Sequence, residues 1–161
     1  MWPMPHQNCA VYWGMAVRVI HITSENRRLL GAIAPDVFDA DIKDRFLDVY
    51  LANSLHALFV ACVDDPASPD HEVVIGQARG IVHFHPDQPA EFYVENLGVT
   101  PRYQRQGIAT KLMDALIDWG EAQDIDYTWL GTEADNDGAI GFYKRYGFRP
   151  SPMIMFDDEG E

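Results

Sequence analysis

Apolar and polar positions in the first third of the chain change period, and each change predicts a new element. Residues 16–22 alternate as a strand would, and Thr23 or Ser24 can cap a helix that begins near Glu25. Within residues 41–53 the apolar positions recur at spacings typical of an amphipathic helix. A strand followed by two helices is therefore expected to open the chain.

The middle of the chain has the pattern of a sheet. Apolar stretches cover residues 56–63, 72–85 and 90–99, and turns rich in Pro and Asp separate them. The densest group of turn-forming residues, 64–70, lies between the first two of these stretches. Successive strands joined in this way predict an antiparallel meander.

After Pro101 the period becomes that of a helix. One apolar stripe is formed by residues at helical spacing, namely Ile108, Leu112, Ala115, Leu116 and Trp119. Residues 126–132 predict another strand, and a further helix is expected over 136–146, where Gly147 can take the left-handed conformation that ends a helix. Residues 152–156 are expected to form a last strand.

These elements predict an α/β protein of the α+β type, with the order β-α-α-β-β-β-α-β-α-β. The long helix before the fifth strand acts as a parallel crossover, so a central mixed sheet flanked by helices is expected. A chain of 161 residues is long enough for one substantial core and short for two. We expect a single domain over residues 15–161 after a loose leader, residues 1–14, that lacks the features of a secretory signal.

Composition narrows the class of partners. A formal net charge of −13 repels phosphate backbones, so nucleic acid is not an expected partner and a cationic ligand suits the surface better. No stretch approaches the roughly 20 apolar residues that cross a bilayer, so no membrane association is expected. The two cysteines, Cys9 and Cys62, indicate neither a disulfide framework nor a zinc site, and a reducing cytoplasm is the expected location.

Residues 99–110 carry the clearest chemical signal. They join a strand to the N-terminus of the long helix, where unpaired backbone N–H groups and the helix dipole can bind an anion such as a pyrophosphate. Gly107 and Ala109 allow phosphate oxygens to approach the backbone. Arg102 and Arg105 add cationic donors. A turn glycine before a helix would explain Gly107 by itself, so the longer pattern around it decides the interpretation.

Two motifs make that pattern specific. Residues 104–109, Gln-Arg-Gln-Gly-Ile-Ala, resemble the Q/R-x-x-G-x-G/A signature of the GNAT superfamily of N-acetyltransferases. Residues 136–148 are similar to that superfamily's N-x-x-A-x-x-F-Y-x-x-x-G-F helix. The resemblance implies a GNAT-like fold, acetyl-coenzyme A as co-substrate, and direct transfer of the acetyl group to a primary amine. The glycine patterns of a P-loop or a Rossmann site are not found.

The resemblance also implies a set of cofactor-binding residues. The main chain at the end of the fourth strand would pair with the pantetheine arm as an added strand does, and the following loop would bind the pyrophosphate. The set comprises Leu97, Gly98, Val99, Arg102, Gln104, Arg105, Gln106, Gly107, Ile108, Ala109 and Thr110, together with Asn136 and Tyr143. Asn136 is equally well explained as an ordinary helix N-cap.

Tyr143 and Glu95 are the candidate catalytic residues. Tyr143 matches the superfamily's thiolate-protonating tyrosine, and a phenol of pKa about 10 can donate to an alkylthiolate of similar basicity. Packing against neighbouring aromatic residues is the alternative explanation. Glu95 shares a face with Leu97 by the period-two rule, so it is a candidate base, although glutamates on strands commonly face solvent. Glu133 and Asp135 are rivals that would equally suit a cationic acceptor.

His83 and His85 form an H-x-H pair that resembles part of a metal site. The sequence offers no further ligand at a persuasive spacing, so no metal is expected. These histidines are therefore left without a predicted role in the chemistry.

The acceptor stays open at the level of sequence. Residues 129–136 and 153–158 resemble the aminoglycoside 3-N-acetyltransferase branch, and the carboxylates there would suit a small cationic amine; they are Glu133, Asp135, Asp157 and Asp158. A protein lysine or N-terminal amine is the alternative acceptor, and a non-catalytic acyl-coenzyme A-binding module is a third hypothesis. Because members of the superfamily are often dimers, the resemblance also allows a homodimer.

Overall fold

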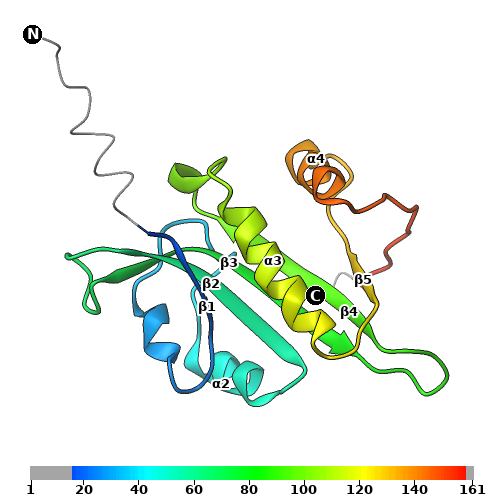
Figure 1. Ribbon diagram of the computed structural model, residues 1–161, viewed down its shortest axis with the longest axis horizontal. Coiled ribbons are helices and arrows are strands. Elements are labelled where there is room, and N and C mark those ends of the chain that lie inside the picture. The colour runs from blue at the N-terminus through cyan, green and yellow to red at the C-terminus, as the bar shows by residue number, and fades with distance from the viewer. Residues whose placement is uncertain (1–15, 159–161) are drawn as a thin grey trace, which may run out of the picture. The chain divides into compact units, whose positions relative to one another are not determined.

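The computed structural model describes residues 16–158, in two compact units of which one ends at Leu130 and the other begins at Gly131 (Figure 1). Each unit is described by itself. The predicted leader, residues 1–14, lies outside the described residues together with Cys9. A single domain over residues 15–161 stays a prediction.

The first unit is built on a five-stranded sheet in the order β1-β2-β3-β4-β5. Its strands are β1 (Arg18–His21), β2 (His56–Asp64), β3 (Glu72–His83), β4 (Glu91–Val99) and β5 (Tyr127–Leu130). The first four strands pair antiparallel, and β5 pairs parallel to β4. The crossover to β5 runs through α3 (Ile108–Glu121), drawn in yellow-green in Figure 1. The predicted meander and mixed sheet are confirmed.

The first predicted helix is much shorter than expected. It is a 3₁₀-helix, η1 (Arg27–Gly31), and neither Thr23 nor Ser24 caps it. Asn26 turns the chain instead, because its Oδ1 accepts from the Thr23 N–H at 2.8 Å and its Nδ2 donates to the His21 carbonyl at 2.8 Å. The second predicted helix is confirmed as α2 (Asp44–Ala52).

Alternate side chains of β2 point to opposite faces of the sheet and pack into two separate cores. Leu58, Val60 and Cys62 are buried in one apolar cluster with residues of η1 and α2. On the other face, the Phe59 ring stacks on His21, which in turn meets Trp119 of α3 at a centroid distance of 6.3 Å. The sheet is therefore covered by α3 on one face and by η1 and α2 on the other.

Helix α3 approaches the sheet closely because two glycines face one aromatic ring. Phe92 of β4 fills the space beside Gly80 of β3 and Gly120 of α3, and a Cβ built at these glycines would lie 2.3 and 2.7 Å from the ring. Leu112, Met113 and Leu116 of α3 are fully buried. This packing fixes the helix, and hence its N-terminus, against β3 and β4.

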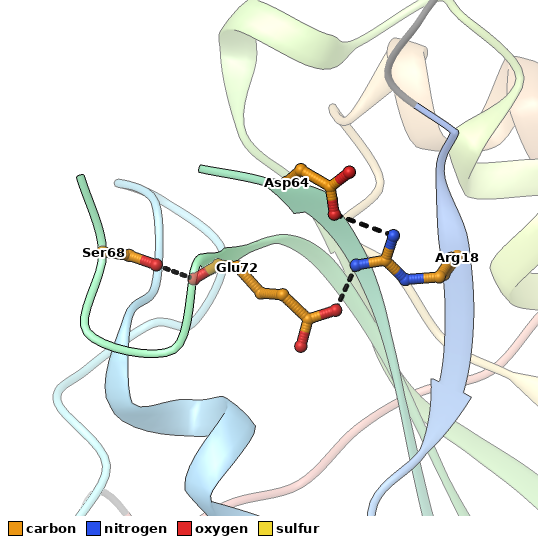
Figure 2. A network of polar contacts seen from close by, with 4 residues as sticks. All are labelled: Arg18, Asp64, Ser68 and Glu72. Atoms are coloured by element: carbon orange, nitrogen blue, oxygen red, sulfur yellow. Dashed lines mark hydrogen bonds and ion pairs between the residues drawn. The ribbon is translucent and has the colours of Figure 1, made fainter. Parts of the chain in front are cut away.

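The far edge of the sheet is held by a polar network at Arg18 (Figure 2). The guanidinium of Arg18 bonds Asp64 at 2.9 Å and also bonds Glu72, so it joins β1 to both strands of the β2–β3 hairpin. Ser68 of the predicted turn donates to the Glu72 carbonyl at 2.5 Å. Since these groups are partly exposed, the network positions the hairpin and adds little to stability.

The described part of the second unit, residues 131–158, contains one helix, α4 (Asp137–Tyr146). The strand expected over residues 152–156 is not formed, and that prediction is wrong for the described structure. The apolar side chains of Met153, Ile154, Met155 and Phe156 are exposed. A strand requires a neighbour that satisfies its backbone groups, and the described part of this unit holds no other strand.

Candidate active site

A β-bulge interrupts β4 at Glu95. Gly80 of β3 pairs with Val94 and Arg79 pairs with Asn96, so Glu95 is an extra residue without a partner in the ladder. A bulge changes which face the following side chains occupy. The period-two alternation assumed from the sequence therefore breaks at this residue.

The bulge separates Glu95 from Leu97, which the sequence analysis placed on one face. Val99 lies on the α3 face, since a Cβ at Gly76 would meet both Val99 and Leu112 of α3. Leu97, two residues earlier, shares that face. Glu95 is instead near Tyr50 of α2, whose pKa is raised by burial and then by the Glu95 carboxylate. The expectation of a shared face is wrong because a regular strand was assumed.

Past the bulge, β4 has a free edge within the first unit. The pairing with β5 covers only Glu91–Val94, so residues 95–99 have no strand beside them on that side. The Thr100 N–H donates to Ile75 of β3 at 2.9 Å. Because backbone groups alternate in direction along a strand, the N–H groups of Leu97 and Val99 point toward the free edge. An extended ligand can therefore pair there as an added strand.

Gly98 contributes by its lack of a side chain. A Cβ at this position would lie 2.7 Å from the Val37 carbonyl oxygen, which belongs to the loop between η1 and α2. The backbone N–H and C=O groups of Gly98 point toward β3, whereas those of Leu97 and Val99 point toward the free edge. Gly98 therefore admits the loop to the bulged part of β4, a role that its sequence context did not reveal.

The loop before α3 presents unpaired backbone donors. Arg105 has φ 59° and Gly107 has φ 79°, so two residues adopt the left-handed conformation that turns N–H groups toward one side. In the described structure, no backbone N–H of residues 105–110 donates to a backbone carbonyl; the first that does is Lys111, to Gly107 at 3.1 Å. These amides are therefore free to bind an anion.

Two glutamines of the same loop hold its shape. The Gln104 amide donates to the Val99 carbonyl at 2.9 Å, and the Gln106 amide donates to the Arg102 carbonyl at 3.3 Å. The first of these bonds ties the loop to the end of β4. The glutamine of the recognised motif thus has a structural explanation within the loop itself.

Glu95 lies among polar groups on the α2 side of the sheet. Its Oε2 is buried without a hydrogen-bond partner, as is the Nε of Arg79 on the neighbouring strand. Burial and then the Glu95 carboxylate raise the pKa of the Tyr50 phenol, whereas the positive charge of Arg79 lowers it. A carboxylate oxygen in this state is available to accept a proton or an ammonium donor.

A buried amide network beside the bulge was missed by sequence reasoning. Gln77 is fully buried, and its Nε2 donates to Asn96 at 2.6 Å and to the Val37 carbonyl at 3.3 Å. Asn96 in turn donates to Asp39 at 3.2 Å. The one available signal was the position of Gln77, a polar residue within an otherwise apolar strand.

In the second unit, both ends of α4 are capped by motif residues. The Asn136 side chain accepts from the Ala139 N–H at 3.1 Å. At the other end, the N–H groups of Gly147 and Phe148 donate to the Lys144 and Tyr143 carbonyls at 3.2 and 2.9 Å, which is a Schellman motif. The predicted left-handed cap at Gly147 is confirmed by its φ of 120°.

The Tyr143 ring packs beside the C-terminal cap of α4. It lies 6.2 Å from that of Phe148 and 5.4 Å from that of Phe142, both edge to face. Burial raises the pKa of the Tyr143 phenol above its ordinary value, so the group stays protonated at neutral pH. Packing therefore accounts for the position of the Tyr143 ring. The hydroxyl, which stays protonated, is able to donate a proton.

The remaining predicted site residues belong to separate segments of the two units. Glu133 and Asp135 lie exposed in the loop before α4, and Asp158 is exposed near the end of the described chain. His85 pairs with Glu91 at 2.8 Å, while His83 packs on Tyr93. Among residues 16–158 no cluster of three or more His, Cys, Asp or Glu has the arrangement of a metal site. None of the described helices is both long and apolar enough to cross a membrane.

The first unit thus combines a mixed sheet, a bulged fourth strand with a free edge beyond it, and a loop of unpaired backbone amides before the crossover helix. The Acetyltransferase (GNAT) family model matches residues 23–148, and the chain belongs to this family. Its members are acyltransferases, and the recognised resemblance is confirmed.

Named relatives match mainly a short segment. N-alpha-acetyltransferase 30 of Schizosaccharomyces pombe is 41% identical over 56 residues, 35% of this chain and 37% of that protein. The ribosomal protein bS18-alanine N-acetyltransferase of Escherichia coli strain K12 is 42% identical over 58 residues, 36% and 39% of the two chains. The matched segment thus spans less than half the length of these relatives.

Solved structures extend the likeness of fold to nearly the whole chain. One is an aminoglycoside N-acetyltransferase, AAC(6')-Iy, in complex with CoA, with a TM-score of 0.70 and 18% identity over 91% of this chain and 96% of that one. At this identity the likeness concerns the fold, and the predicted fold class is confirmed.

Proposed function

We propose that this protein transfers the acetyl group of acetyl-coenzyme A directly to a primary amine. The observation that carries the proposal is the run of free backbone N–H groups at residues 105–110, which lies next to the free edge of β4. The amides suit a pyrophosphate, and the edge suits the amide-bearing pantetheine arm. Arg102 and Arg105 add positive charge at the loop.

Acetyl transfer requires a deprotonated amine and a proton for the departing thiolate. The amine nitrogen forms the new bond to the carbonyl carbon as the carbon–sulfur bond breaks. Glu95 accepts the proton that the amine loses, directly or through a water molecule. Tyr143, protonated at neutral pH, donates a proton to the thiolate. An N–H group at the end of β4 polarises the carbonyl oxygen.

The first candidate acceptor is a small cationic amine of the aminoglycoside type. A net charge of −13 attracts cations, and the exposed carboxylates of Glu133 and Asp135 add to that field. The second candidate is the N-terminal amine of a protein, because two of the similar proteins are an N-alpha-acetyltransferase and a ribosomal protein bS18-alanine N-acetyltransferase. Transfer to either acceptor uses the same bond changes.

The test is release of free coenzyme A thiol from acetyl-coenzyme A in the presence of a panel of amines. We expect turnover with at least one amine, and a fall in kcat of about 10²-fold in Tyr143→Phe, because the general acid is lost. Tyr127→Phe, which removes an exposed phenol, is the matched control and should keep full activity. Coenzyme A binding without turnover of any amine would favour a non-catalytic module instead.

A further inference from the structure

A chain of polar side chains joins the middle of the sheet to the loop between η1 and α2. We call Gln77, Asn96 and Asp39 the amide network. Gln77 Nε2 donates to Asn96 at 2.6 Å and to the Val37 carbonyl oxygen at 3.3 Å, and Asn96 Nδ2 donates to the Asp39 carboxylate at 3.2 Å. Because a carboxylate accepts hydrogen bonds, Asn96 must turn its Nδ2 toward Asp39 and its Oδ1 toward Gln77. The carboxylate thus fixes the direction of both side-chain bonds.

The loop has few other polar attachments. Val37 is buried in the core at the start of the loop, but in the described structure no backbone group of residues 38–42 is hydrogen-bonded to another backbone group. Arg79 forms a long ion pair with Asp39, at 3.9 Å, and lies over the Phe38 ring. Since the Asp39 side chain is mostly exposed, that pair adds little. The position of residues 38–42 therefore depends mainly on the amide network.

Stability alone does not explain a glutamine at position 77. The Gln77 side chain is fully buried, and its Oε1 has no hydrogen-bond partner among the described residues. A buried acceptor without a donor is unfavourable, and an apolar side chain of similar size would avoid this cost. The other residues of β3 from Val74 to Ala78 are buried and carry no polar side chain. A positioning role accounts for the amide where burial does not.

The bulged part of β4 contacts this loop and also carries the free edge. The Asn96 side chain bonds the loop, and Gly98 admits it, since a Cβ there would lie 2.7 Å from the Val37 carbonyl oxygen. The N–H groups of the alternate residues, Leu97 and Val99, point toward the free edge. A ligand that pairs with Leu97 and Val99 restricts the backbone of the residues beside them. The loop and the free edge thus depend on the same short stretch of β4.

We propose that Gln77 and Asn96 are positioning residues that couple the free edge of β4 to the loop of residues 38–42. This rests on the proposed function, in which the pantetheine arm pairs with that edge. Pairing of the arm restricts the bulged strand, where Glu95 has no partner in the ladder, and the amide network then restricts the loop. Coenzyme binding therefore orders the loop through the network.

The coupling acts on a hollow of about 300 Å³ in the same loop, lined by residues 33–36 and 38–42. A hollow of this size is at the lower limit of small-ligand sites. All of its lining belongs to one short segment, so its shape changes whenever the loop moves. The coupling gives the hollow one shape when the coenzyme is bound and several shapes when it is not.

NMR relaxation of the backbone amides of the full chain, with and without saturating coenzyme A, tests the coupling. In the parent protein we expect the order parameters of residues 38–42 to rise from below about 0.6 to about 0.85 when the coenzyme binds. In Gln77→Met, which keeps the length of the side chain and removes the amide, they should stay below about 0.6 in both states. Gln123→Met just after α3, where the amide donates to the Trp119 carbonyl at 3.5 Å, is the matched control and should behave as the parent.

An exchange of two side chains tests the same network outside the core. Asn96→Asp sets two carboxylates against each other, so the order parameters of the loop should stay low with coenzyme A bound. Asn96→Asp combined with Asp39→Asn restores a donor opposite an acceptor at the net charge of the parent, and the ordering should return. These variants provide the test if Gln77→Met fails to fold.

The outcomes separate the two proposals. Equal ordering of the loop in the parent and in Gln77→Met or Asn96→Asp, or no ordering in the parent with coenzyme A bound, overturns the coupling and leaves acetyl transfer intact. Failure of the parent to bind coenzyme A overturns the proposed function itself. Ordering that is lost in Asn96→Asp and regained in the double variant supports the coupling.

Discussion

His21 is a titratable residue enclosed by aromatic rings between β1 and α3. Its imidazole stacks on Phe59 at 4.7 Å and meets Trp119 edge-on. Burial lowers the pKa of His21 below its ordinary value of 6.5, because the charged form is poorly solvated there. The folded state therefore favours the neutral imidazole at this position.

This arrangement predicts that the protein loses stability in mild acid. Below about pH 6.5 the unfolded chain binds a proton at His21 while the folded chain does not, so the free energy of unfolding decreases as the pH falls toward the lowered folded pKa. Above pH 6.5 both states are neutral and the contribution is constant. Thermal melts of the parent and His21→Phe over pH 5–8 test this; a parent curve no steeper than that of the variant would contradict it.

Gly107 combines a left-handed backbone with open surroundings. A Cβ at this position meets nothing within 4 Å, yet the φ of 79° makes any side chain strained by about 1–2 kcal/mol. Gly107→Ala should fold and bind coenzyme A about tenfold more weakly, because the methyl group occupies the approach of the phosphate oxygens. Titration calorimetry measures this effect. Gly31→Ala, also in open space but without a positive φ, is the matched control and should bind normally.

At the scale of elements, the contact between α3 and the sheet depends on Gly120. Alanine is favoured over glycine in a helix by about 1 kcal/mol, but here its methyl group would clash with Phe92, and overpacking costs about 1–3 kcal/mol. We expect Gly120→Ala to be destabilised by about 1 kcal/mol and rescued by Phe92→Leu, measured by urea unfolding. Gly141→Ala in α4, where the nearest atom is the movable end of Arg145, should instead be neutral or stabilising.

The elements with a clear hydrophobic period were predictable from the sequence. The strands of the meander and helix α3 lie close to their expected limits, since their apolar positions face a core. The bulge at Glu95 was not predictable, because one extra residue in β4 leaves no mark in the alternation on either side. The strand at 152–156 was expected from alternation alone, although a strand forms only with a partner.

The candidate site divides in the same way. The loop of free backbone amides before α3 was predictable because its glycine and the following helix are adjacent in the sequence. The Gln77–Asn96 network and the aromatic cluster of His83, Tyr93 and Trp129 combine residues from separate strands, and only the register brings them together. Residues whose role depends on neighbours from distant parts of the sequence were therefore not predicted.

At the scale of the whole molecule, the net charge of −13 is expected to act on the two proposed substrates in opposite directions. The field attracts a cationic acceptor and repels the anionic coenzyme, and salt screens both effects. Raising the ionic strength should therefore lower kcat/KM for the amine while leaving unchanged or raising kcat/KM for acetyl-coenzyme A. Steady-state kinetics at two salt concentrations test this, and a parallel fall for both substrates would contradict it.

The account as a whole depends on the free backbone N–H groups that precede α3. Amide hydrogen exchange with and without coenzyme A measures their engagement directly. We expect the coenzyme to slow exchange at residues 105–110 and at Leu97 and Val99, because these amides become hydrogen-bonded to the bound ligand. Saturating coenzyme A that leaves the exchange of all these amides unchanged would contradict the account.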